Sequence, residues 1–257
     1  MESRPGSGSA EPAGSHTREV FDWLVIAHSS LPATDFMSET ALLAARSPDA
    51  RLDLKGMLPE ELRAYLASLG KERYRTKQLL GWIYGRGATS FEEMTDLSRA
   101  FRKELSGRAR VSRLSDVRRT GSADGKAIKF LFGLEDGLRI ESVLMYEKGR
   151  RTLCLSSQIG CPLDCSFCAT GRMGLLRNLR ASEIVDQVIA VRREIQASGE
   201  DLTNVVMMGM GEPLLNFGPV VRAIRLMGLE MGPCISAKKV TLSTAGPGSY
   251  AVASRQF

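Results

Sequence analysis

The sequence lacks features that would place it in several common classes of protein. Its 257 residues contain no hydrophobic run long enough to cross a bilayer, because the apolar stretch from Val20 to Ala27 is short and is interrupted by Asp22. Arg18 and Glu19 precede that stretch and make it a poor core for a secretory signal. We therefore expect a cytoplasmic chain that does not span a membrane.

Cysteine and histidine are also scarce. The five cysteines are an odd number, and three of them, Cys161, Cys165 and Cys168, fall within eight residues. This clustering indicates metal ligation rather than a disulfide framework, and the chain is too long for a disulfide-stabilised miniprotein. The only two histidines, His16 and His28, lie far from the cysteines in sequence.

The overall composition is that of an ordinary globular protein, with 43% hydrophobic and 25% charged residues. Lysine and arginine number 35 against 29 acidic residues, which gives a formal net charge of +6. A basic excess favours a polyanionic partner but does not establish one.

Residues 1–53 begin with a stretch rich in Gly, Ser, Pro and Glu and show no sustained helical or strand periodicity. They carry too little patterned apolar surface to offset the entropy of ordering. We expect a disordered extension with a short helix at residues 39–46. A targeting peptide is the alternative, and scattered acidic residues argue against it.

Residues 54–119 show leucines at helical spacing and predict a small helical domain with three helices, the third capped by Asp96. Basic side chains lie on its polar faces and just after it. A solvated basic surface is the ordinary explanation, and an RNA-binding face is the alternative. The basic residues are Lys71, Arg73, Arg75, Lys77, Arg102, Lys103, Arg108, Arg110, Arg113, Arg118 and Arg119.

Residues 120–150 alternate apolar and polar side chains around Asp-Gly and Lys-Gly turns, which predicts an antiparallel β-hairpin connector. Residues 151–246 then alternate strands and helices, one of them capped by Ser182, which implies a parallel sheet. About three strands follow Arg151, too few to close a barrel. We expect an α/β fold, a partial (βα) barrel preceded by the small helical domain and the hairpin.

The strongest motif is the loop Cys161-Pro-Leu-Asp-Cys165-Ser-Phe-Cys168 between a strand and a helix. Structural zinc sites and most electron-transfer clusters use four protein ligands, whereas this loop offers three. Three thiolates on a [4Fe–4S] cluster leave one iron open for chemistry. Three unrelated core cysteines are the alternative explanation.

A second motif, Met208-Gly-Met-Gly-Glu212-Pro-Leu, follows an apolar strand one βα unit later. Glycines allow close backbone approach, and a carboxylate can accept hydrogen bonds from an ammonium group. With Phe167 before the last cysteine, the two motifs together resemble the radical S-adenosylmethionine (SAM) superfamily. The resemblance implies a [4Fe–4S] cluster whose open iron chelates SAM.

A longer string, RTLCLSSQIGC from Arg151, runs on through Cys168-Ala-Thr-Gly and residues 178–184. Over about residues 54–246 the chain resembles the family of adenine-C2 methyltransferases that act on large-subunit ribosomal RNA and on transfer RNA. Family membership implies those RNAs as partners, an electron donor such as flavodoxin or ferredoxin, and a monomer.

The resemblance also implies a two-stage reaction, because C2 of adenine is electron-poor and does not attack a sulfonium methyl group. One SAM methylates a cysteine near the C-terminus of family members, and a second yields the radical that activates this methyl group. The carbon then bonds to C2, and the RNA is released by a base and a second thiol.

By position, Glu141 matches the family's proton acceptor and Cys154 its resolving thiol, while Gly211, Glu212 and Ser243 match its cofactor contacts. Each has an ordinary alternative. For Glu141 the alternative is a solvent-facing carboxylate on a strand. For Cys154 it is a small buried hydrophobic residue, and for Ser243 it is a hydroxyl at the end of a strand.

Residues 247–257 have no family counterpart, and Cys234 matches no family cysteine, so we expect it to be structural. We expect the methyl-carrying cysteine to belong to a missing segment, and this chain not to complete methyl transfer. Two other functions stay open: a non-enzymatic RNA-binding fragment and a radical SAM enzyme with another substrate, such as a glycyl-radical activase.

Overall fold

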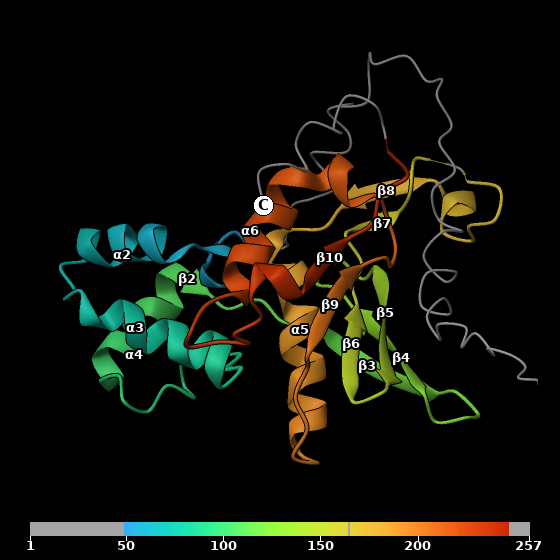
Figure 1. The fold of residues 1–257 in the computed structure, drawn as a ribbon. Coiled ribbons are helices and arrows are strands. Elements are labelled where there is room, and N and C mark those ends of the chain that lie inside the picture. The colour runs from blue at the N-terminus through green and yellow to red at the C-terminus, as the bar shows by residue number, and fades with distance from the viewer. Residues whose placement is uncertain (1–48, 164, 247–257) are drawn as a thin grey trace, which may run out of the picture.

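The computed structural model describes residues 49–163 and 165–246 (Figure 1). Of the expected disordered extension at residues 1–53, residues 1–48 with the helix expected at 39–46 lie outside the described residues, as do residues 247–257. Residues 49–53 are described, and Leu52–Asp53 form strand β1, so the expectation of disorder is wrong there.

The helical domain forms as expected from its leucine spacing. Leu62 and Leu66 are buried on α2 (Pro59–Ser68), which begins with a proline at its first helical position. The second apolar run forms α3 (Tyr74–Leu80) and continues as one π-helical turn, η3 (Gly81–Gly85). A short 3₁₀ turn, η2 (Leu54–Gly56), precedes these helices.

The third helix, α4 (Arg99–Arg108), begins later than the sequence predicts. Its N-cap is Ser98, whose side chain accepts a hydrogen bond from the Phe101 N–H, so the assignment of Asp96 as the cap is wrong. The Asp96 carboxylate instead accepts a hydrogen bond from the indole N–H of Trp82 at 2.6 Å. Strands β1 (Leu52–Asp53) and β2 (Ala109–Arg110) pair in parallel and close this domain.

The remainder of the chain is built on one six-stranded sheet that joins the expected hairpin to the expected parallel strands. In spatial order the strands are β10 (Val240–Leu242), β9 (Asn204–Met207), β6 (Arg150–Cys154), β5 (Arg139–Glu147), β4 (Ala127–Gly133) and β3 (Ser115–Gly121). The pairs β10–β9 and β9–β6 are parallel, as predicted. The pairs β6–β5, β5–β4 and β4–β3 are antiparallel.

One face of this sheet is covered by α5 (Ala181–Gln196), with α6 (Phe217–Met227) packed beside α5 (Figure 1). Ser142 on β5 donates to Gln187 of α5 at 2.7 Å, and Arg119 on β3 forms an ion pair with Glu194 of the same helix. The covered face carries side chains that are at most 1% exposed: Phe130, Phe132, Ile140, Leu144, Leu153 and Val205.

Helix α5 begins two residues earlier than expected. Arg180 occupies the N-cap position, and its backbone N–H donates to the Glu183 carboxylate at 2.8 Å. Ser182 is therefore not the cap but a buried residue of the first turn.

The helical domain packs on the outer side of α5 and α6, which gives three layers in Figure 1: small helices, covering helices and sheet. The Lys55 ammonium lies 2.6 Å from the Asp186 carboxylate of α5, and both side chains are buried. The Tyr84 hydroxyl donates to the Lys55 carbonyl, and burial raises the Tyr84 pKa far above its usual value. Two further ion pairs join α2 to α6: Glu61 with Arg222, and Glu60 with Arg225.

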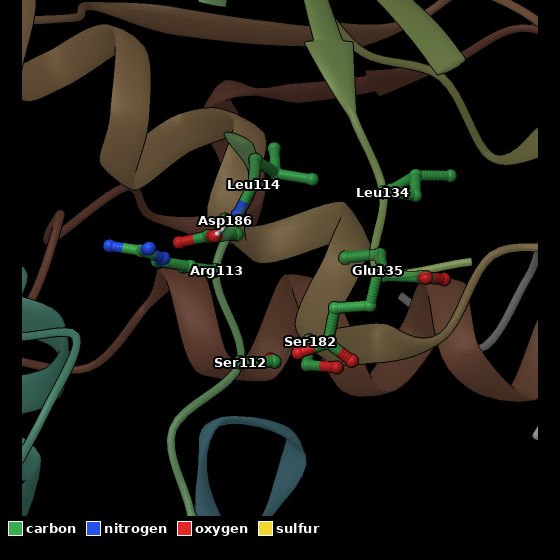
Figure 2. A pocket seen from close by; sticks show the side chains of 8 residues that line it. Ser112, Arg113, Leu114, Leu134, Glu135, Ser182 and Asp186 are labelled. Carbon is green, nitrogen blue, oxygen red and sulfur yellow. Dashed lines mark hydrogen bonds between the residues drawn. The ribbon is translucent and has the colours of Figure 1, made fainter. Parts of the chain in front are cut away.

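A small cavity of about 10 Å³ lies at this junction, between Ser112, Glu135 and Ser182 (Figure 2). It holds at most about one water molecule. At its wall the Leu114 N–H donates to Asp186 at 2.7 Å. The cavity is thus part of the domain junction and is too small for a cofactor.

Two small antiparallel strands, β7 (Gln158–Gly160) and β8 (Leu175–Asn178), flank the cysteine loop, and the 3₁₀ turn η4 (Gly171–Met173) lies between them. A further 3₁₀ turn, η5 (Pro213–Asn216), follows the glycine-rich motif, and η6 (Ala237–Lys239) precedes β10. Among the described residues, no helix has the length and hydropathy needed to cross a membrane.

Candidate cofactor and catalytic site

The three segments with sequence motifs meet at one edge of the sheet. Because β6, β9 and β10 run in parallel, their carboxyl ends lie together, and this edge is where α/β sheets bind ligands. The cysteine loop follows β6, the glycine-rich motif follows β9, and Ser243 follows β10. In Figure 1 the β7–β8 pair lies close to the carboxyl ends of β9 and β10.

A network of hydrogen bonds ties the segment after β6 to the glycine-rich motif. The N–H groups of Ser157 and Gln158 both donate to the Met210 carbonyl, at 2.8 and 3.1 Å. The Met210 N–H donates to the Ser156 hydroxyl at 2.9 Å, and the Glu212 N–H donates to Gln158 Oε1 at 2.8 Å. The two motifs therefore behave as one packed unit.

The glycines of this motif allow the backbone to pack closely against the segment after β6. A Cβ on Gly209 would come within 2.6 Å of the Leu155 carbonyl oxygen, and one on Gly211 within 2.4 Å of Gln158 Cβ. Gly211 also has a φ of +96°, which favours glycine. Both glycines permit close approach to the β6 segment, and a contact of Gly211 with a cofactor stays a prediction.

The Glu212 carboxylate has partners within the protein. Its Oε1 accepts from the Leu214 N–H at 3.0 Å, capping η5, and its Oε2 accepts from the Ala245 N–H at 2.9 Å. The side chain is 3% exposed. Glu212 thus holds the segment after β10, which includes half-buried Ser243, against the glycine-rich motif.

The cysteine loop starts from a tightly constrained turn. Gly160 has a φ of +76°, and a Cβ there would lie 1.7 Å from the Gly174 carbonyl oxygen. That same carbonyl accepts from the Cys161 N–H at 3.0 Å, and the Cys168 N–H donates to the Cys165 carbonyl at 2.9 Å. Cys161 is buried, whereas Cys165 and Cys168 are half-buried.

The donor set of this loop fits an iron–sulfur cluster. Its three donors are cysteine thiols, the ligands that hold iron–sulfur clusters in proteins. Burial raises the pKa of the Cys161 thiol, and a backbone hydrogen bond from Leu163 opposes this effect. Within residues 49–163 and 165–246, no three Cys, His, Asp or Glu side chains are arranged around a single metal ion. Each thiolate of a [4Fe–4S] cluster binds a different iron, so the three sulfurs need not converge on one point.

Apolar side chains are exposed along the same loop. Phe167 is 75% exposed and Met173 is 55% exposed, and Leu175 and Leu176 on β8 are also exposed. Large exposed apolar groups gathered in one segment are typical of a binding surface.

A buried ion triad anchors the end of the loop. The Arg177 guanidinium is 2.8 Å from Glu183 on α5 and 2.5 Å from Asp136 in the β4–β5 turn. Burial lowers the pKa of Arg177, but the two carboxylates outweigh burial and leave it raised. No local sequence pattern marks this triad, because its members lie in three separate elements.

Glu141 and Cys154 lie on the same face of the sheet, opposite the one that α5 covers, and no described helix packs on it. Cys154 on β6 pairs with Val143 on β5, and Glu141 is two residues before Val143. The Glu141 carboxylate forms an ion pair with Lys129 of β4 at 3.0 Å, and both side chains are partly exposed. Burial raises the pKa of the Cys154 thiol, although a backbone hydrogen bond from Met208 opposes this.

Cys234 is exposed and lies away from these groups in sequence. It has a φ of +54°, and its thiol donates to the carbonyls of Glu230 at 3.0 Å and Leu229 at 3.4 Å. These bonds stabilise a turn, in agreement with the structural role expected for it.

Comparison with known proteins agrees with this arrangement. Residues 52–111 match the family model of the ribosomal RNA large subunit methyltransferase N-terminal domain, and residues 155–250 match that of the radical SAM superfamily. A crystal structure of a radical SAM methyltransferase from Sphaerobacter thermophilus matches with a TM-score of 0.75 and 41% identity, covering 80% of this chain and 60% of that chain. The expected fold class is therefore confirmed.

Curated relatives are similar over the same region. The dual-specificity RNA methyltransferase RlmN of Geobacter sulfurreducens is 48% identical over 77% of this chain and 53% of its own length. The protein of the same name from Syntrophotalea carbinolica is also 48% identical, over 77% of this chain and 52% of its own length. The chain thus spans about half the length of the curated relatives it matches.

Proposed function

We propose that this chain, which belongs to the radical SAM family of dual-specificity RNA methyltransferases, serves in the methylation of C2 of adenine in ribosomal and transfer RNA through a methyl-cysteine. The observation that carries the proposal is the meeting of the three-cysteine loop, the glycine-rich motif and Ser243 at one sheet edge, beside the face that bears Glu141 and Cys154.

Cys161, Cys165 and Cys168 would hold a [4Fe–4S] cluster, and Gly211, Glu212 and Ser243 would lie against SAM. When bound, the cluster and SAM supply the radical chemistry that an electron-poor ring carbon requires. The exposed apolar side chains of the loop, Phe167 first among them, offer a surface that excludes water from the ligand.

The Glu141 carboxylate is suited to accept the C2 proton of adenine once the new carbon–carbon bond has formed. Glu141 lies on the face of β5 opposite α5, and its carboxylate forms an ion pair with Lys129 on the neighbouring strand β4. A base must be within hydrogen-bond reach of its proton, and the open face leaves room for an RNA base to approach.

The Cys154 thiol is suited to release the RNA by forming a disulfide with the methyl-carrying cysteine, as the sulfur–carbon bond to the RNA breaks. Burial raises the pKa of this thiol, and a backbone hydrogen bond from Met208 opposes the effect. This thiol and Glu141 lie on adjacent strands, so both can reach one bound base.

The remaining parts of the proposal follow from the same chemistry. A flavodoxin or ferredoxin would supply the electron, the cytoplasm would keep the five thiols reduced, and the chain would act as a monomer.

The test is anaerobic reconstitution with iron, sulfide and reductant, followed by incubation with SAM and unmodified ribosomal RNA. We expect an oxygen-sensitive [4Fe–4S] signal in electron paramagnetic resonance and the formation of 5′-deoxyadenosine. Replacing Cys161, Cys165 and Cys168 together by Ala should abolish both, whereas Cys234→Ala should change neither. A cluster that survives the triple replacement would overturn the ligand assignment.

Product analysis separates the competing functions. 2-Methyladenosine that depends on Cys154 and Glu141 supports the proposed reaction and contradicts the expectation that this chain does not complete methyl transfer. 5′-Deoxyadenosine without methylated RNA indicates a radical enzyme with another substrate, and neither product indicates an RNA-binding protein without this chemistry.

A further inference from the structure

The helical domain carries a surface cleft of about 180 Å³ that has no part in the site described above. It lies where α3 passes into the π-helical turn η3, opposite the loop before α4. Its lining residues are Lys77, Gln78, Gly81, Trp82, Arg86 and Asp96.

The cleft has a rigid aromatic wall. The Arg86 guanidinium lies 4.0 Å from the centroid of the Trp82 ring. The Trp82 N–H donates to Asp96 at 2.6 Å, which fixes the ring plane. The π-helical turn Gly81–Gly85 sets Trp82 and Arg86 one turn apart, and such irregular turns occur often at functional sites.

The charged side chains that line the cleft, Lys77, Arg86 and Asp96, carry a net positive charge. Lys77 and Arg86 are exposed, and within the described residues neither forms an ion pair. The single carboxylate of the lining, Asp96, is already engaged by Trp82. In the sequence, the basic residues of the helical domain are spread over several helices. In the structure, two arginines stack on aromatic rings, Arg86 on Trp82 and Arg75 on Tyr74.

We propose that this cleft binds one unpaired RNA nucleotide, with its base stacked on the Arg86–Trp82 pair and its phosphate contacted by Lys77. Proteins bind unpaired RNA bases by stacking them on aromatic rings or on the planar guanidinium of arginine. The proposal rests on RNA being the substrate in the function proposed above, and it adds a second contact far from the target base in the fold.

The size and polar groups of the cleft favour a single nucleotide. Drug-sized ligands occupy pockets of about 300–1,000 Å³, so a cleft of about 180 Å³ suits one base. Gln78 Oε1 accepts from Arg75 at 2.9 Å, and its amide N–H₂ has no partner among the described residues, so it can donate to a base edge. A fully paired duplex hides its base faces and should not enter.

Tryptophan fluorescence gives a direct readout. The chain has two tryptophans, Trp23 and Trp82, so Trp23→Phe leaves Trp82 as the sole reporter. We would titrate the reconstituted full chain with a short RNA hairpin whose loop holds unpaired adenines, and with a fully paired RNA duplex of equal length. We expect saturable quenching by the hairpin and little by the duplex.

Substitutions then separate stacking from charge. Arg86→Lys keeps the positive charge but removes the planar guanidinium on which a base can stack. We expect this variant and Arg86→Ala to weaken hairpin binding by about tenfold each. Lys77→Ala should weaken binding and lower the slope of log affinity against log salt by about 1. Lys126→Ala, at an exposed position in the turn between β3 and β4 and outside the helical domain, is the matched control and should change affinity less than twofold.

The outcomes are distinct from those that test the proposed function. Unchanged hairpin affinity in Arg86→Lys, or equal quenching by duplex and hairpin, would overturn the nucleotide site while SAM cleavage and RNA methylation could still succeed. Specific quenching with no SAM cleavage would instead support the site and overturn the radical enzyme function. Circular dichroism confirms that each variant is folded.

Discussion

The two faces of the six-stranded sheet differ in almost every physical respect. The face against α5 is apolar, and its side chains, such as Leu144 and Leu153, are fully buried. The opposite face carries Glu141, Lys129 and Cys154, which are partly exposed. Strand β5 contributes to both, because successive side chains point to opposite faces.

The difference shows how one sheet can separate stability from chemistry. Burial of apolar side chains stabilises the fold on one side, and ionisable groups remain accessible on the other. Mutations on the two faces should therefore have different effects, and the following predictions test this comparison from the largest expected effect to the smallest.

The largest loss of stability is expected at the junction between the helical domain and α5, where Lys55 forms a buried ion pair with Asp186. Lys55→Met removes one charge of a buried pair and leaves the Asp186 carboxylate without its cation, which should cost about 3–5 kcal/mol of unfolding free energy. Lys71→Met, which breaks a partly exposed pair with Glu104, should cost about 0–1 kcal/mol. Urea denaturation measures both, and equal losses would show that the junction is not a dry interface.

A direct comparison of the faces uses two neighbours on β5. Leu144→Ala should cost about 2–5 kcal/mol, because a fully buried side chain leaves a cavity. Val143→Ala, on the open face, should cost about 1 kcal/mol or less, because Val143 is only half-buried. If both substitutions cost the same, a further segment must cover the open face in solution.

A smaller difference is expected between the alkylation rates of two thiols, Cys154 and Cys234. In the apoprotein, iodoacetamide should modify exposed Cys234 well before Cys154. Because burial raises the Cys154 pKa, the alkylation rate of Cys154 should keep rising with pH after an ordinary thiol has levelled off. Peptide mapping by mass spectrometry follows each site, and fast labelling of Cys154 at neutral pH would contradict the structure.

The smallest effect is expected for the ion pair on the open face. Lys129→Ala should change the unfolding free energy by about 0–1 kcal/mol, because both partners are about half exposed. Thermal denaturation at low and high salt provides the measurement. A large, salt-independent loss would mean that Glu141 and Lys129 are buried in solution.

Local elements were largely predictable from the sequence. The leucines of α2, the Asp-Gly turn between β4 and β5, and the alternation of strand and helix after Arg151 are short-range patterns, and each formed as expected. Helix starts were less predictable, because Asp96 and Ser182 are good capping residues that the tertiary structure uses elsewhere.

Candidate residues were found where a motif marks them, and missed where only packing does. The cysteine loop and the glycine-rich motif are visible as spacings. By contrast, Arg177 and the Arg86–Trp82 pair showed no pattern, since an arginine looks the same in sequence whether it is buried, stacked or solvated.

The sequence by itself determined the order of elements, the three-thiol loop and the chemistry that those thiols can support. Only the tertiary structure decided which partners each carboxylate has within the protein: Glu212 and Glu183 are buried among hydrogen-bond donors, whereas Glu141 is partly exposed and pairs with Lys129. The physical reason is that burial and partners depend on contacts between distant residues. Lys55 and Asp186, 131 residues apart in sequence and 2.6 Å apart in space, are such a contact.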